Sequence, residues 1–192
     1  GGGAYMRTKN HDNEFQKIAI GRNRLLLKDH NGQWMRISSF KGKVLLIEPV
    51  GMNCPACIAF SGGNRPGVGA FQGNAPQTGV WAIEDYILNR GGGIRIDDPD
   101  LVFIQLLLYS PGMQPPTTEE VAAWVKHFNL SRFPNYVALA GDDRMINQAS
   151  YDMIPGFQVV DRDRVLQVDF TGHNPRHTPL QIIDYLKQSL SS

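Results

Sequence analysis

Apolar and polar residues follow one another along this chain in blocks that predict strands and helices. Two segments, Val44–Val50 and Leu101–Tyr109, are apolar at almost every position. Runs of this length and composition are typical of strands that are covered on both faces of a sheet. We therefore expect these two segments at the centre of the fold.

Shorter segments predict the remaining strands. Asn31-Gly32 is the two-residue signal of a tight hairpin, with apolar segments on either side of it. Near the C-terminus, two further apolar segments are separated by four charged residues, which predicts a second hairpin. The strands expected beside the two central ones are 25–28, 33–37, 135–140, 156–160 and 165–170.

The helices are predicted from helical spacing and from capping signals. Thr117 with Glu120 makes a capping box, and Thr178-Pro179 is a typical helix start. Trp81, Tyr86, Trp124 and Phe128 fall at helical spacings, and we expect them in the core. The helices are predicted at 54–60, at 80–88, from Thr117 to about Phe128, and from Thr178 onward, with one or two turns in 145–151.

Strands that alternate with helices, followed by a hairpin and a last helix, predict an α/β fold with a mixed sheet covered on both faces. The polar segment 1–24 is interpreted as an N-terminal arm, and 25–192 as one domain. Residues 61–79 hold six glycines and two prolines and form a long glycine-rich insertion after the first helix. Such long loops are often functional.

Composition excludes several classes of function. The chain has 192 residues, 42% of them hydrophobic and 19% charged, which is ordinary for a globular domain. A net charge of +1 gives no field that would favour nucleic acid as a partner. No apolar run is long enough to span a bilayer. We interpret Gly1–Ala4 as a remnant of cloning, so a signal or membrane anchor could have preceded the chain.

The two cysteines of the chain, Cys54 and Cys57, form a C-x-x-C motif directly after the Val44–Val50 strand. If Cys54 begins a helix, Pro55 takes the first helical position, where a missing N–H costs nothing. Cys57 then lies one turn along on the same face, and the positive end of the helix favours a Cys54 thiolate. Three interpretations follow: a redox-active pair, a metal site or an inert structural disulfide.

Four motifs, in order, resemble the thioredoxin superfamily, in its branch of TlpA/ResA-like oxidoreductases and peroxiredoxins. The resemblance covers roughly Leu25 to Leu190 and implies a thioredoxin fold with an N-terminal β-hairpin. The four motifs are the entry hairpin with its following strand (Leu27–Gln33 and Ser39–Leu46), the Cys54-Pro55-Ala56-Cys57 site, the cis-proline strand (Met153–Pro155 with Gly156–Asp161) and the next strand to Gly172.

The resemblance also implies roles for individual residues. Cys54 would attack the substrate disulfide, and Cys57 would resolve the mixed disulfide. Glu48, six residues before Cys54, would accept the Cys57 proton if it is buried; the alternative is an edge-strand residue that faces water. Ile154 and Pro155, with a cis peptide bond between them, would pair with the backbone of the substrate, beside Asn53 and Pro55.

Departures from the family patterns narrow the chemistry. Asn53 replaces the aromatic residue that usually precedes the first cysteine. Gly51 stands where peroxiredoxins need Thr or Ser, which argues against a peroxidase. Sco-type copper chaperones use C-x-x-x-C and a His before the cis-proline, where this chain has C-x-x-C and Met153-Ile154.

Metal sites remain minor alternatives. His173 and His177 could complete a zinc set with the cysteines, but Pro175 argues against the helix that usually presents such a pair. Met52 beside the cysteines could form a soft Cu(I) site, with turn packing as its ordinary role.

We therefore predict a thiol–disulfide oxidoreductase that needs no metal or other cofactor. Its partners would be protein thiols and disulfides and a redox partner protein. The alternative is a non-enzymatic module that carries Cu(I) or holds a structural disulfide. By analogy with the TlpA/ResA-like branch, we expect a bacterial periplasmic or other extracytoplasmic location, with the cytoplasm left open. The 61–79 insertion is either a flap that shapes a docking groove or an idle loop.

Overall fold

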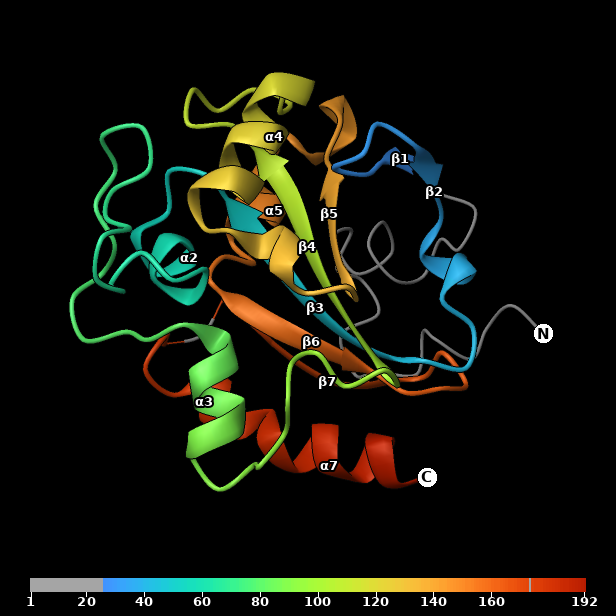
Figure 1. The fold of residues 1–192 in the computed structure, drawn as a ribbon. Helices are drawn as coiled ribbons and strands as arrows, with labels where there is room; N and C mark the ends of the chain where they lie inside the picture. Colours follow the sequence, from blue (N-terminus) through green and yellow to red (C-terminus); the bar gives the residue numbers. More distant parts are fainter. Residues whose placement is uncertain (1–25, 173) are drawn as a thin grey trace.

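A five-stranded sheet with strand order β5-β4-β3-β6-β7 forms the centre of the chain (Figure 1). The computed structural model describes residues 26–172 and 174–192, so the predicted N-terminal arm and His173 lie outside the described residues. The strands of the sheet are β3 (Val44–Gly51), β4 (Leu101–Tyr109), β5 (Tyr136–Ala140), β6 (Gly156–Val160) and β7 (Leu166–Thr171).

The sheet is mixed, as the sequence predicts. β3 and β4 are parallel, as are β4 and β5, whereas β6 is antiparallel to β3 and β7 to β6. Val44 pairs with Leu101 at one end of the two central strands, and Glu48 pairs with Gln105 in the middle. The cysteines follow β3, so they lie at the opposite end of the sheet from Val44.

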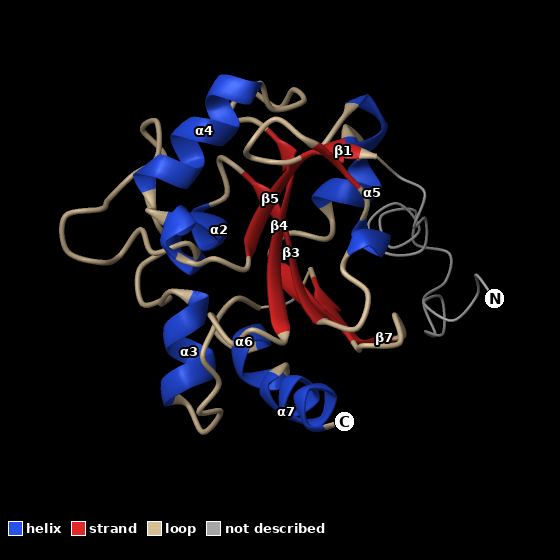
Figure 2. Cartoon of the chain, turned by 45° about the vertical axis from the view of Figure 1, so that its right-hand side comes forward, coloured by secondary structure: helices blue, strands red, loops and turns tan. Residues whose placement is uncertain are grey.

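Helices cover one face of the sheet, and a hairpin with shorter elements covers the other (Figure 2). The helical face carries α2 (Pro55–Phe60), α3 (Ile83–Asn89), α4 (Thr118–His127), α6 (Thr178–Gln181) and α7 (Ile183–Ser191). The other face carries the β1 (Leu27–Lys28) and β2 (Trp34–Met35) hairpin, the 3-10 turns Ile37–Ser39 and Asp143–Met145, and α5 (Gln148–Tyr151); a third 3-10 turn, Leu130–Arg132, follows α4.

Alternate residues of the central strands belong to different cores. Val44, Leu46 and Val50 pack with the helices, whereas Leu45 and Ile47 pack beneath the hairpin. This period of two follows from the pleat of a strand and explains why β3 is apolar throughout. Glu48 and Gln105 interrupt the apolar pattern on the helical face.

The main differences from the prediction lie at helix ends. The second helix begins at Ile83 rather than Val80, because Ala82 is its N-cap and Val80 and Trp81 are not helical. Trp81 is 41% exposed, so its predicted place in the core is wrong; Tyr86, Trp124 and Phe128 are buried as expected. The last helix is divided into α6 and α7 at Ile182. The capping box of Thr117 and Glu120 is confirmed.

Candidate active site

Cys54 occupies the N-cap of α2. Its backbone is extended, and its Sγ accepts a hydrogen bond from the Cys57 N–H at 3.2 Å. Pro55 takes the first helical position, as predicted from the sequence. The pKa of the partly exposed Cys54 thiol is lowered, because the Cys57 thiol and the N–H groups of Cys57 and Ala56 stabilise the thiolate against the effect of burial. Cys54 is therefore suited to nucleophilic attack.

Cys57 lies one turn further into the same helix and is fully buried. Burial raises the pKa of its thiol well above the ordinary value. The hydrogen bond to Cys54 and the negative charges of Cys54 and Glu48 act in the same direction. Both cysteines are free thiols in the structure. The two sulfurs thus differ in access and in acidity, as an attacking and a resolving thiol should.

Glu48 is fully buried in the middle of β3, so the alternative of a water-facing edge residue is wrong. Its side chain faces the helical core that contains Cys57. Gln105 Nε2 donates a hydrogen bond to Glu48 Oε1 at 3.0 Å, while Glu48 Oε2 has no hydrogen-bond partner. Burial raises the pKa of Glu48 well above its ordinary value; the Gln105 hydrogen bond lowers it, and the charge of Cys54 raises it.

The Ile154–Pro155 peptide bond is cis, and it directly precedes β6. β6 runs antiparallel to β3, with Ile47 opposite Gln158. Continuing this register places Ile154 and Pro155 beside the end of β3, where the chain turns toward Cys54. The Ile154 N–H donates to the Tyr151 carbonyl at 3.3 Å, and the predicted pairing of Ile154 and Pro155 with a substrate stays a prediction.

The Asn53 side chain contacts the loop that follows β4. Its Nδ2 lies 3.4 Å from the Pro111 carbonyl and 3.3 Å from the Met113 sulfur. Asn53 therefore ties the turn before Cys54 to the loop that follows β4. This is a structural contact, and the predicted role of Asn53 in substrate binding stays a prediction.

Tyr109, at the end of β4, is a site residue that the sequence reasoning missed. Its ring lies against Gly51, where a Cβ would be 2.6 Å from Tyr109 Cε2, and packs edge-on against Tyr151 at 5.1 Å. Burial raises the pKa of Tyr109, and the charges of Cys57 and Cys54 raise it further. Gly51 is thus required by the close approach of Tyr109, and the absence of a side chain at position 51 was the signal that could have pointed to a bulky neighbour.

Comparison with solved structures identifies the fold. A provisionally assigned protein disulfide isomerase from Bacteroides thetaiotaomicron matches with a TM-score of 0.55 at 14% identity, over 88% of this chain and 86% of that one. A thioredoxin-like protein from Porphyromonas gingivalis matches with a TM-score of 0.53 at 15% identity, over 87% and 90%. Copper-bound ScoI from Arabidopsis thaliana matches with a TM-score of 0.52 at 16% identity, over 85% and 96%.

This chain has the thioredoxin fold. The fold class expected from the sequence is therefore confirmed. No protein-family model and no curated protein matches the sequence. At these identities the structural matches show the fold alone.

The glycine-rich insertion of this thioredoxin fold is anchored at both ends and in its middle. Phe71 is buried with its ring centroid 5.0 Å from that of Trp124. The Gln77 N–H donates to the Pro55 carbonyl at 2.9 Å, and Asn64 Nδ2 donates to the Gln77 carbonyl at 2.7 Å. The insertion therefore packs beside the first turn of α2, next to Cys54.

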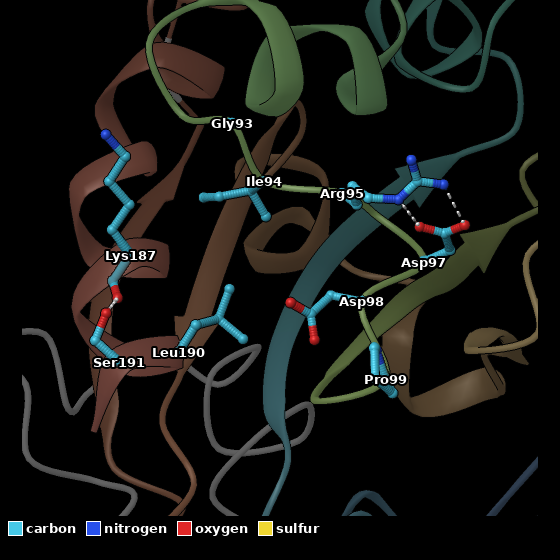
Figure 3. Close-up of a pocket in the computed structure, with 9 residues that line it drawn as sticks. All are labelled: Gly93, Ile94, Arg95, Asp97, Asp98, Pro99, Lys187, Leu190 and Ser191. Carbon is cyan, nitrogen blue, oxygen red and sulfur yellow. Dashed lines mark hydrogen bonds and ion pairs between the residues drawn. The ribbon is translucent and has the colours of Figure 1, made fainter.

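Other regions offer less for catalysis. A cavity of about 580 Å³ lies between the segment before β4 and α7 (Figure 3). Because Leu101 pairs with Val44, this cavity lies at the opposite end of β3 from the cysteines. Two of its charged residues, Arg95 and Asp97, form an ion pair with each other. The cavity is lined by Gly93, Ile94, Arg95, Asp97, Asp98, Pro99, Lys187, Leu190 and Ser191.

The described residues contain no cluster of three or more His, Cys, Asp or Glu side chains that could hold a metal ion. The zinc alternative depended on His173, which lies outside the described residues. Met52 is fully buried in the helical core, consistent with turn packing. Within residues 26–172 and 174–192, no helix is long and apolar enough to cross a membrane.

Proposed function

We propose that this chain is a thiol–disulfide oxidoreductase of the TlpA/ResA-like type, acting on protein substrates outside the cytoplasm. The observation that carries the proposal is the asymmetry of the dithiol. Cys54 is accessible at a helix N-cap with a lowered pKa, and Cys57 is buried one turn away with a raised pKa. An inert structural disulfide would need no such difference.

The reaction has two balanced steps. In the first, the Cys54 thiolate attacks one sulfur of a substrate disulfide, the substrate S–S bond breaks, and one substrate sulfur leaves as a thiolate. In the second, Cys57 loses its proton and attacks the Cys54 sulfur. The Cys54–Cys57 disulfide forms as the second substrate sulfur leaves. Two electrons pass from the dithiol to the substrate, and the reverse sequence oxidises a substrate dithiol.

Glu48 is the proposed acceptor of the Cys57 proton. The negative charge of Glu48 raises the pKa of the buried Cys57 thiol, so the two groups lie within electrostatic reach of each other. Burial raises the pKa of the carboxyl well above its ordinary value, which makes its ionised form a stronger base toward the Cys57 thiol. Ile154 and Pro155 supply the backbone edge beside the cysteines where an extended substrate segment would pair.

Thiol titration with single-cysteine variants tests this function. The rate of Cys54 alkylation by iodoacetamide, followed against pH by mass spectrometry, should give a midpoint below the value of about 8.5 for a free cysteine. Cys57 should stay unmodified in the folded chain. With a disulfide-bonded protein such as insulin, Cys57→Ser should accumulate a mixed disulfide at Cys54. Its matched control, Cys54→Ser, should accumulate none.

The same experiments separate the rival functions. A Cys54 midpoint near 8.5 together with a reduction potential below about −300 mV would identify a structural disulfide and contradict the proposal. Anaerobic titration with Cu(I) tests the copper-carrier alternative. Stoichiometric Cu(I) binding that depends on both cysteines, with no measurable disulfide exchange, would favour that alternative over the oxidoreductase.

A further inference from the structure

A buried glutamine of β4, Gln105, joins Glu48 to three other side chains of the core. Gln105 lies opposite Glu48 in the parallel pair of β4 and β3, and both side chains face the helical core. Trp124 Nε1 and the Tyr136 hydroxyl both donate to Gln105 Oε1, at 2.9 Å and 2.6 Å. Gln105 Nε2 donates to Glu48 Oε1 at 3.0 Å and to Ser61 Oγ at 2.8 Å.

The chemistry of these partners fixes which way the amide of Gln105 points. The indole nitrogen of Trp124 is a donor only, so the Gln105 atom that faces it must be the oxygen. The amide nitrogen is thereby directed at Glu48 and Ser61, with one hydrogen for each. The Ser61 hydroxyl in turn donates to the Cys57 carbonyl at 3.0 Å. Every hydrogen of the network has a defined acceptor.

This arrangement also decides which oxygen of Glu48 can take a proton. Oε1 accepts the N–H of Gln105, so a proton is excluded from the side that faces the amide. Oε2 is buried and has no hydrogen-bond partner, which leaves it as the free acceptor. We propose that Gln105 is a positioning residue of the dithiol site, which holds Glu48 with Oε2 free and holds the α2 turn that carries Cys57 through Ser61. The proposal rests on the oxidoreductase function proposed above.

The titratable groups that act on Glu48 are few. Cys54 and Cys57 on α2 interact with its charge, and so does Tyr136 on β5. Gln105 is neutral and contributes only its hydrogen bond. Since that bond stabilises the carboxylate, its loss should make Glu48 harder to ionise and should move the pH at which it can act as a base upward.

The experiment compares Gln105→Leu with a matched control, Gln158→Leu. Gln158 is equally buried in the same sheet but faces the other core, and neither of its side-chain polar atoms has a hydrogen-bond partner. The first readout is the titration of the Glu48 side-chain carboxyl in the reduced protein by ¹³C NMR, with the resonance assigned from its loss in Glu48→Gln. The second readout is the pH profile of the step that resolves a preformed mixed disulfide at Cys54.

For Gln105→Leu we expect the Glu48 midpoint and the acid limb of the resolution rate to shift upward together by about one to two pH units, the equivalent of one hydrogen bond to a charged group. Gln158→Leu should leave both unchanged. If Gln105→Leu does not fold, the double variant Trp124→Phe with Tyr136→Phe serves instead, because it keeps Gln105 but frees its amide to rotate. An upward shift is expected there too.

A Glu48 midpoint that is the same in wild type and in the Gln105 or Trp124/Tyr136 variants would overturn the positioning role. That failure is distinct from a failure of the proposed function. If Cys57→Ser forms no mixed disulfide at Cys54, the oxidoreductase proposal falls, while the NMR titration still reports whether Gln105 controls the ionisation of Glu48.

Discussion

Truncation of Phe71 tests whether the glycine-rich insertion is part of the folded core. Phe71 is 2% exposed, and its ring meets those of Trp124, His127 and Phe128 with centroid separations of 5.0, 5.5 and 6.1 Å. Replacement of a buried Phe by Ala typically costs about 3–5 kcal/mol. Because a loop can close around part of the cavity, we expect the lower end, about 3 kcal/mol, for Phe71→Ala. Against a typical net stability of about 5–15 kcal/mol, this is a large fraction.

The free energy of unfolding is measured by urea denaturation followed by far-UV circular dichroism, at constant m-value. The matched control is Leu88→Ala, since Leu88 is 44% exposed on α3 and should change stability by less than about 0.5 kcal/mol. Amide exchange at Gln77, whose N–H bonds the Pro55 carbonyl, reports separately on the end of the insertion nearest Cys54. If Phe71→Ala lowers the free energy of unfolding by less than about 1 kcal/mol and leaves amide exchange at Gln77 unchanged, the insertion is not part of the folded core.

The same insertion has a functional test. If it shapes a docking groove, deletion of residues 62–78 should lower exchange rates with some protein substrates more than with others, while alkylation of Cys54 by a small reagent stays similar. Equal rates on every substrate would leave the insertion with a structural role only.

Two further predictions concern buried residues of β3. Gly51→Thr should destabilise the chain by about 1–3 kcal/mol through overlap with Tyr109. In thermal denaturation, Tyr109→Ala should lower the stability less in the Gly51→Thr background than in wild type. If the effects of the two substitutions simply add, the contact between the two positions is contradicted. Burial raises the pKa of Glu48 in the folded chain above its ordinary value near 4.5. Between the pKa of the unfolded chain and that of the folded chain, the native state keeps a proton that the unfolded state has lost. The free energy of unfolding of wild type therefore falls as the pH rises through this range. Glu48→Gln cannot ionise and escapes this loss. At pH 8 its free energy of unfolding, measured in urea, should exceed that of wild type by at least about 1 kcal/mol, and the difference should shrink below pH 4. Equal stability of the two proteins at both pH values would contradict a raised pKa for Glu48.

The apolar runs of the sequence predicted the sheet well. The strand at Leu101–Tyr109 and the strand at Gly156–Val160 have their predicted bounds, and Val44–Val50 is extended by one residue to Gly51. Continuous burial on both faces leaves little choice of element, so such segments are the easiest to predict. The start of α3 was harder, because nothing local distinguishes Val80 and Trp81 from the helix that follows.

The candidate site was predictable only in part. Cys54, Pro55 and Cys57 are local in sequence, and one helix turn fixes their relation. Gln105 was hidden inside an apolar run, and its hydrogen-bond partners Trp124, Tyr136 and Ser61 lie 19, 31 and 44 residues away along the chain. No helical or strand periodicity in the sequence links residues at such separations. Only the tertiary fold shows that the one polar side chain of β4 faces the acid of β3.

The contact between Gly51 and Tyr109 also constrains how this site could evolve. A larger residue at position 51, including the Thr or Ser of the peroxiredoxin pattern, overlaps the Tyr109 ring and destabilises the chain while that ring is present. Loss of Tyr109 first would remove this overlap but would leave a cavity beside the dithiol and against Tyr151. Either order of the two substitutions therefore passes through a destabilised intermediate. Packing against Tyr109 thus opposes a peroxiredoxin-like residue at position 51, in addition to the absence of that residue from the sequence.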